Sequence, residues 1–149
     1  KGYYRNPEAT AEVLDRDGWF RTGDLGKIDG QGRLHIVGRS KELIIHGGFN
    51  VYPPEVEAAL NDHPQVIQSA VIGRSRDGDE EVLAFVQAAP DDLPDPADLK
   101  AFVAERLTGY KRPAQIIVGT DLPAAPTGKI LKHALLDHFA DRLDLPPDS

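Results

Sequence analysis

The chain has 149 residues, of which 40% are hydrophobic and 28% are charged, so it fits one medium globular unit or two small ones. Its 17 Lys and Arg against 24 Asp and Glu give a net charge of −7, which argues against non-specific binding to nucleic acid or anionic membranes. The absence of Cys excludes disulfides and thiolate zinc sites and is typical of a reducing compartment, so we predict a cytoplasmic protein. No apolar run is long enough to span a bilayer.

The first 40 residues differ in charge and pattern from the remainder. Residues 1–40 carry seven basic and six acidic side chains, a net +1, whereas residues 41–149 carry ten and eighteen, a net −8. The first segment is rich in Gly and Asp, with short apolar pieces between turn signals, a pattern that predicts a β-meander. No signal segment or initiator Met opens it, so we expect the chain to begin inside a longer protein.

Helices and strands are predicted to alternate from residue 41 onward. Pro53-Pro54 opens one helix, and Asp95 caps a second that has Pro96 at its first position. A last helix is predicted to start near Gly128. Its expected buried face consists of Ile130, Leu131, Ala134, Leu135, His138 and Phe139.

Three strands are predicted at residues 66–74, 82–88 and 115–118, with a polar turn at 76–79 joining the first two. With the helices, they predict an α+β fold: a short β-rich segment, then a small domain in which helices cover a three-stranded sheet.

Several common motifs are rejected. Gly128-Lys129 is not followed by the Ser or Thr that a phosphate loop needs, because Ile130 occupies that position. Gly30-x-Gly32 lacks the third Gly of a dinucleotide fingerprint. His133 and His138 are five residues apart and do not share a helix face, so no metal site is predicted.

Three polar residues stand in unusual surroundings. Asp24 lies at a strand entrance, Arg39 lies in a charged segment before an apolar strand, and Lys129 falls in the first turn of the predicted last helix. The ordinary interpretations are a capping Asp, a surface Arg and a solvated Lys. Lys129 is the most informative, because the helix macrodipole disfavours a cation there. The position is explained if Lys129 and the free N–H groups both face an anion.

Seven short segments carry motifs in a characteristic order: residues 2–8, 19–24, 38–42, 47–48, 52–57, 110–113 and 122–130. Together they resemble the C-terminal part of adenylate-forming enzymes, the superfamily of acyl-CoA synthetases, luciferases and peptide-synthetase adenylation domains. The resemblance covers about nine-tenths of the chain, and ordered motifs with matching spacing are far more specific than any one of them alone.

The resemblance implies that residues 1–40 are the β-rich end of a large N-terminal adenylation domain. Residues 41–149 would then form a small mobile lid with a β-hairpin near its hinge. The implied activity is that of an ATP-dependent carboxylate–CoA ligase, which forms an acyl-adenylate and then a thioester, with ATP and coenzyme A as cofactors. The expected partner is the chain's own N-terminal domain, which would hold the phosphate loop, the acyl pocket and Mg²⁺. Without that domain, the chain is expected to be inactive.

Site residues are implied position by position. Asp24 resembles the carboxylate that accepts both ribose hydroxyls of ATP, and Arg39 resembles the guanidinium beside that ribose. Lys129 resembles the catalytic lysine that bridges the substrate carboxylate and the α-phosphate. Lys41 lies at the hinge about which the small domain swings between the two half-reactions.

The coenzyme A residues are implied in the same way. Gly47 and Gly48 fall in the hairpin that lines the pantetheine tunnel, where only a residue without a side chain lets the thiol arm pass. Lys111 matches residues near the CoA phosphates. The turn at residues 73–80 lacks the Pro usual in relatives and is shortened.

Two alternatives belong to other classes. One is an adenylation domain that loads a carrier protein, and the other is a binding module without chemistry. The joint presence of Asp24, Arg39, Lys41 and Lys129 disfavours the module, because a module has no need for a ribose carboxylate and a carboxylate-binding lysine. The acyl substrate cannot be named, since its pocket lies in the preceding domain.

Overall fold

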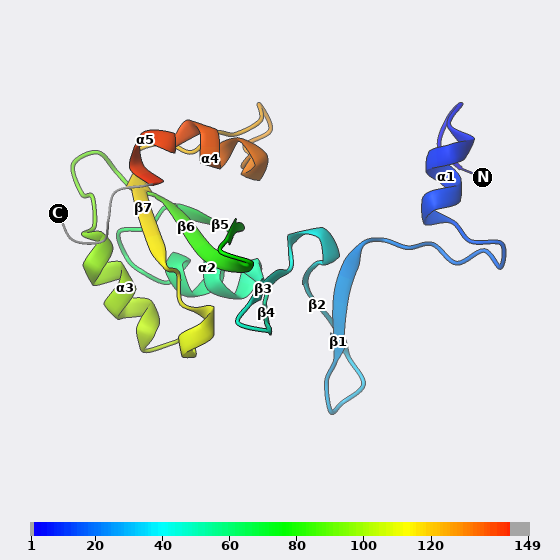
Figure 1. Cartoon of the computed structure of the whole chain (residues 1–149), viewed down its shortest axis with the longest axis horizontal. Coiled ribbons are helices and arrows are strands. Elements are labelled where there is room, and N and C mark those ends of the chain that lie inside the picture. The colour runs from blue at the N-terminus through cyan, green and yellow to red at the C-terminus, as the bar shows by residue number, and fades with distance from the viewer. Residues whose placement is uncertain (1, 144–149) are drawn as a thin grey trace. The chain divides into compact units, whose positions relative to one another are not determined.

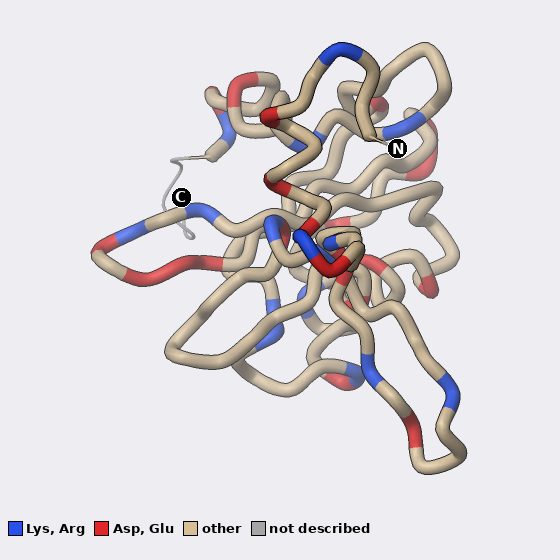
Figure 2. The backbone as a smooth tube through the Cα atoms, turned by 90° about the vertical axis from the view of Figure 1, so that its right-hand side faces the viewer, with Lys and Arg blue, Asp and Glu red and all other residues tan. Residues whose placement is uncertain are grey.

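The computed structural model describes residues 2–143 and contains two compact units, which divide between Lys41 and Glu42 (Figure 1). Acidic and basic residues are interspersed along the backbone of both units (Figure 2). Among the described residues, no helix has the length and apolar character needed to cross a bilayer.

The first unit combines one helix with one hairpin. Helix α1 (Pro7–Val13) begins after Asn6, whose side chain accepts the N–H of Ala9. Strands β1 (Asp24–Ile28) and β2 (Leu34–Arg39) pair antiparallel. The predicted β-meander is therefore wrong for residues 7–13, because an Asn cap followed by Pro at the first helical position starts a helix.

A three-stranded sheet forms the centre of the second unit, in the order β5-β6-β7. Strands β5 (Gln68–Arg76) and β6 (Asp79–Gln87) are antiparallel and joined by a two-residue turn, whereas β7 (Gln115–Gly119) runs parallel to β6. A parallel neighbour requires a crossover, and helix α3 (Pro96–Ala104) lies in that connection. The three predicted strands are confirmed, with bounds shifted by up to three residues.

Helices cover both faces of this sheet (Figure 1). Alternate residues of β6 enter different clusters: Val82, Ala84 and Val86 pack with α2 (Pro53–Asn61) and α3, and Leu83 and Phe85 pack with the C-terminal segment. The period of two that places neighbouring side chains on opposite faces produces this division. The predicted α+β architecture and the helices opened by Pro53 and Pro96 are confirmed.

Short elements complete the second unit. Strands β3 (Ile44–His46) and β4 (Phe49–Val51) form a small antiparallel hairpin. Its first and last residues, Ile44 and Val51, are buried in the core that contains α2. The 3₁₀ turns η1 (Ser40–Glu42), η2 (Gly109–Lys111) and η3 (Lys132–Ala134) precede or follow these larger elements.

The predicted last helix is wrong at its start. Gly128 has φ +83°, and the chain around it forms a tight loop in which Ala124 bridges Ile130. Helical structure begins only at η3 and continues in α4 (Leu135–His138) and α5 (Ala140–Leu143). Lys129 therefore does not lie in the first turn of a helix, and the macrodipole argument for an anion at that position no longer applies.

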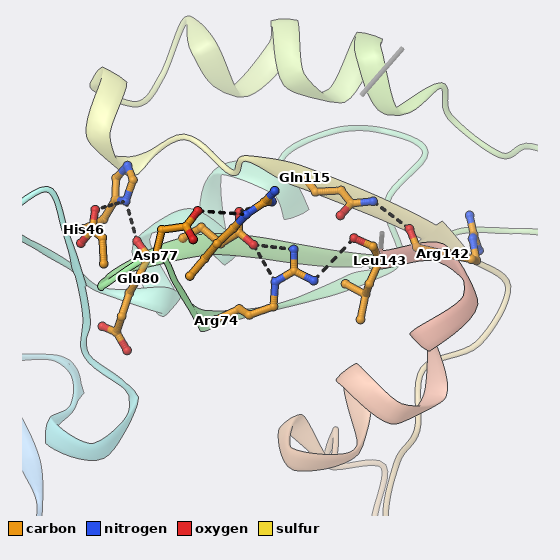
Figure 3. Close-up of polar contacts among 10 residues, drawn as sticks. His46, Arg74, Asp77, Glu80, Gln115, Arg142 and Leu143 are labelled. Atoms are coloured by element: carbon orange, nitrogen blue, oxygen red, sulfur yellow. Dashed lines mark hydrogen bonds and ion pairs between the residues drawn. The ribbon is translucent and has the colours of Figure 1, made fainter. Parts of the chain in front are cut away.

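The end of the described chain is tied to the sheet by side chains that bond to its backbone. Gln115 of β7 donates to the carbonyl of Arg142 at 2.8 Å, and Arg74 of β5 donates to the carbonyl of Leu143 at 3.5 Å (Figure 3). Arg74 is itself held by Glu81 on β6. These contacts seat α5 against the sheet.

Candidate functional site

Asp24 and Arg39 are brought together by strand pairing. They are direct partners in the β1–β2 register, and Arg39 Nε lies 3.2 Å from Asp24 Oδ1. The Asp24 side chain is 30% exposed, so its carboxylate can still accept hydrogen bonds from a ligand. A carboxylate accepts from two adjacent hydroxyls, and the neighbouring guanidinium supplies donors, so this pair fits a ribose. The ribose contact itself remains a prediction.

Lys41 is the middle residue of η1, immediately before the division between the two units. Among the residues that the structure describes, its ammonium makes no ion pair. The hydrogen bonds of the neighbouring Ser40 run back to Gly23, through both its N–H and its hydroxyl. The position is compatible with a hinge, and rotation of the second unit about it remains a prediction.

Gly47 and Gly48 form the tip of the β3–β4 hairpin with φ values of +57° and +79°. Two consecutive positive φ angles are the requirement of a type I′ turn, which glycine satisfies without strain. A Cβ added at either residue would meet nothing within 4 Å. The turn alone thus explains both glycines, and their role in a pantetheine tunnel remains a prediction.

Two acidic residues that the sequence analysis did not single out hold this hairpin. Both carboxylate oxygens of Asp79 accept the Gly47 N–H, at 2.9 and 3.1 Å, and Glu80 Oε2 accepts the Ile45 N–H at 2.6 Å. His46 Nδ1 donates to the Glu80 carbonyl at 2.5 Å (Figure 3). The Gly47 N–H, followed by the N–H of Glu80, holds the pKa of Asp79 below its usual range. The start of β6, directly after its turn from β5, therefore anchors the hairpin.

Lys111 is brought to the same hairpin by an aromatic contact. Phe49, next to Gly48, stacks on Tyr110 with ring centroids 4.6 Å apart. Lys111 follows Tyr110, but its ammonium is 2.6 Å from Glu55 and its side chain is only 19% exposed. A CoA phosphate would have to compete with Glu55 for this cation, so the fit of Lys111 is weaker than its sequence match suggests.

Lys129 lines a cleft of about 670 Å³ in the second unit. The cleft lies between the start of β5 and the loop that leads to η3, with Glu42 and Glu57 on its wall. Across the described residues, the Lys129 ammonium has no ion-pair partner, so it is free to meet an anionic ligand. Gly47, Gly48 and Lys111 do not line this cleft, so the structure does not bring the two predicted sites together.

Lys132, also missed by the sequence analysis, lines the same cleft in a different charge environment. Its ammonium lies 2.8 Å from both Glu42 Oε2 and Glu57 Oε1, and its side chain is 26% exposed. Burial lowers the pKa of Lys132, but the hydrogen bonds to Glu42 and Glu57 outweigh burial and leave the pKa above its usual range. No local signal identifies this residue, because its partners are remote in sequence.

The chain is similar to part of several larger proteins. The family described as AMP-binding enzyme C-terminal domain matches residues 55–129. The 4-coumarate–CoA ligase 1 of Arabidopsis thaliana is 43% identical over 144 residues, which cover 96% of this chain and 26% of that protein. The 2-succinylbenzoate–CoA ligase of Geobacillus kaustophilus is 46% identical over 136 residues, covering 91% and 28%.

A solved structure agrees with this similarity. ATP-bound MatB from Rhodopseudomonas palustris superposes with a TM-score of 0.82 at 42% identity, covering 95% of this chain and 28% of that one. The chain therefore spans under a third of the length of the proteins that it matches.

Proposed function

The chain belongs to the AMP-binding enzyme C-terminal domain family, and from this premise we propose that it is the C-terminal part of an ATP-dependent carboxylate–CoA ligase. In such an enzyme ATP supplies the AMP group that activates a carboxylate, and coenzyme A supplies the thiol that accepts the acyl group. The observation that carries this proposal is the unpaired Lys129 ammonium beside a cleft, three residues from a lysine that two carboxylates neutralise.

Lys129 is the proposed catalytic residue. When a carboxylate attacks an α-phosphate, two anionic groups are forced together, and a fixed ammonium stabilises the charge that gathers there. A lysine already bound to carboxylates could not do this without losing them. Lys129 has no such partner among the described residues, whereas Lys132 and Lys111 do.

The remaining residues take supporting roles. Asp24 and Arg39 hold the ribose of the nucleotide, and Lys41 is the hinge about which the second unit rotates. Gly47, Gly48 and Lys111 serve the coenzyme A side. These three residues lie outside the Lys129 cleft, which supports a separate place on the second unit for each half-reaction.

The rest of the large N-terminal domain is the proposed partner of the first unit, which would form the end of that domain. Apolar side chains are exposed throughout that unit: Tyr3, Tyr4, Trp19, Phe20, Ile28, Leu34 and Ile36. Such a concentration of exposed large apolar residues is typical of a surface that another part of the protein covers. That domain would also hold Mg²⁺, the triphosphate and the acyl group.

The test uses the full-length protein that carries this chain. Carboxylates are first screened for ATP-dependent pyrophosphate release, and Lys129→Ala is then measured in each half-reaction. We expect adenylation to fall by about 10²–10³-fold, the loss typical of one fixed donor, and turnover of supplied acyl-adenylate with CoA to stay nearly intact. Lys100→Ala on α3 is the matched control, because Lys100 makes no ion pair with any described residue.

Each contrary result has its own meaning. Unchanged adenylation by Lys129→Ala would remove its catalytic role, and equal losses in both steps would remove the division of labour. Transfer to a carrier protein but not to CoA would favour the carrier-loading alternative. No pyrophosphate release with any carboxylate would favour the non-catalytic binding module.

A further inference from the structure

Two lysines three residues apart line the same cleft but differ in their surroundings. Lys129 has no ion-pair partner among the described residues, whereas the Lys132 ammonium lies 2.8 Å from each of two carboxylates. Those carboxylates belong to Glu42 and Glu57, which come from segments far away in sequence. Of the two, Lys132 is therefore the one built into the fold.

The segment between the two lysines is internally constrained. The Ala125 N–H donates to the Lys129 carbonyl at 2.8 Å, and the Leu131 N–H donates to the Pro123 carbonyl at 2.8 Å. Ile130 packs against the core cluster that contains Phe139. A contact that fixes Lys132 therefore also limits where the backbone of Lys129 can lie.

The partners of Lys132 connect this loop to two places. Glu42 follows Lys41 directly, so it is the first residue after the proposed hinge. Glu57 lies on α2, and its Oε1 also accepts the Val71 N–H at 2.9 Å, which ties it to β5. Through Lys132, the loop is held both to the residue that directly follows the hinge and to the sheet.

We propose that Lys132 is a positioning residue that clamps the Lys129 loop to Glu42 and Glu57. Lys129 therefore moves as one rigid body with the segment that directly follows the hinge. This inference rests on the proposed function of Lys129 and Lys41. Lys132 is assigned no contact with substrate, because two carboxylates already neutralise its ammonium.

The charge balance of the cleft gives the clamp a second effect. Without the Lys132 ammonium, the Glu42 and Glu57 carboxylates would repel each other with no cation between them, which is unfavourable. The flexible side chain of Lys129 lines the same cleft and would be attracted to them. Lys132 therefore keeps Lys129 available for an anionic substrate as well as holding its backbone.

The test compares four variants of the full-length protein in both half-reactions: Lys132→Met, Lys132→Arg, Glu42→Gln and the double variant that combines Lys132→Met with Glu42→Gln. Lys132→Met keeps side-chain length without charge, and its kcat for adenylation should fall by about 10–100-fold, the loss expected from misplacing a reacting group by about 1 Å. The KM for ATP and turnover of supplied acyl-adenylate with CoA should change by less than about threefold. Lys132→Arg should restore most of the rate, because a guanidinium can pair with both carboxylates. The effects of Lys132→Met and Glu42→Gln should not add, because the two residues are in contact.

Hydrogen exchange of the peptide covering residues 123–134 supplies a readout that does not depend on activity. Exchange should speed up in Lys132→Met and return toward the wild-type rate in Lys132→Arg. If the wild-type protein forms no adenylate but exchange responds in this way, the proposed function fails and the clamp stands. Unchanged exchange, or faster exchange with full adenylation activity in Lys132→Met, overturns the positioning role while Lys129→Ala still tests the function.

Discussion

The carboxylate of Asp79 accepts the backbone N–H of Gly47 with both of its oxygens, at 2.9 and 3.1 Å. This contact joins the β5–β6 turn to the tip of the β3–β4 hairpin, 32 residues earlier in the sequence. The hairpin is short, with three residues in each strand. A hairpin of that size is only marginally stable by itself, so its position depends on such external contacts.

Asp79→Ala is therefore expected to loosen the hairpin tip without unfolding the unit. In the full-length protein, the KM for CoA should rise about tenfold, the effect of losing one charge-assisted hydrogen bond. Pyrophosphate exchange should stay unchanged. Asp77→Asn is the matched control, because Asp77 lies in the same turn with its side chain 96% exposed, and Asn tolerates its positive φ. An equal loss of adenylation in Asp79→Ala would contradict a role confined to the CoA side.

Lys41→Pro tests the proposed hinge at Lys41. Proline fixes φ at about −65° and removes the N–H, which restricts the backbone that has to rotate. Adenylate formation should survive, and thioester formation from supplied acyl-adenylate should collapse. Lys41→Ala, which changes the side chain and leaves the backbone free, should keep both steps. Equal losses of adenylate formation and thioester formation in the Lys41→Pro variant would place the hinge at another residue.

The raised pKa of Lys132 predicts that the free energy of unfolding depends on pH in the alkaline range. A pKa that is raised in the folded state makes the ion pairs contribute fully below the ordinary Lys value of 10.5, and that contribution is lost as pH rises through the folded pKa. The groups that face this ammonium across the cleft are Glu42, Glu57, Lys129 and His133.

Urea unfolding of wild type and Lys132→Met measures this contribution. Near pH 9 the variant should be less stable by about 1 kcal/mol, at the upper end for ion pairs that solvent still reaches, and the difference should shrink as the Lys132 ammonium deprotonates. A difference that persists unchanged above pH 11 would show that packing, not charge, explains the variant.

The chain alone should bind ATP very weakly. Asp24 and Arg39 offer a hold on the ribose, but the part of the chain that the structure describes has no glycine-rich phosphate loop. We expect a dissociation constant above about 1 mM for residues 1–149, because a few exposed hydrogen bonds do not overcome the entropy of binding. Isothermal calorimetry on the chain, with the full-length protein as the positive control, decides this. Micromolar binding by the chain would contradict the proposal that the triphosphate contacts lie outside residues 1–149.

The sequence by itself determined the elements whose signals are local. The helix after Asp95 is specified by a side-chain cap and a proline, and the three strands by short apolar runs between turn signals, so both are predicted within a few residues. Helix α1 carries an equally local signal in Asn6 and Pro7, which was overlooked. The Asp24–Arg39 pair was found through its motifs, and strand register then placed the two residues together.

Only the tertiary structure decided what surrounds Lys129. Apolar spacing from Ile130 to Phe139 fits a helix, but the Leu131 N–H bonds to Pro123 across the loop, so the helix starts later than the pattern predicts. The same holds for the charges, because Lys132 and Glu42 are 90 residues apart in sequence and in contact in the fold. Periodicity and caps act within a few residues, whereas a side-chain ion pair needs both backbones already in place. Which lysine is neutralised and which has no ion-pair partner among the described residues therefore follows from packing, and two lysines three residues apart have different surroundings.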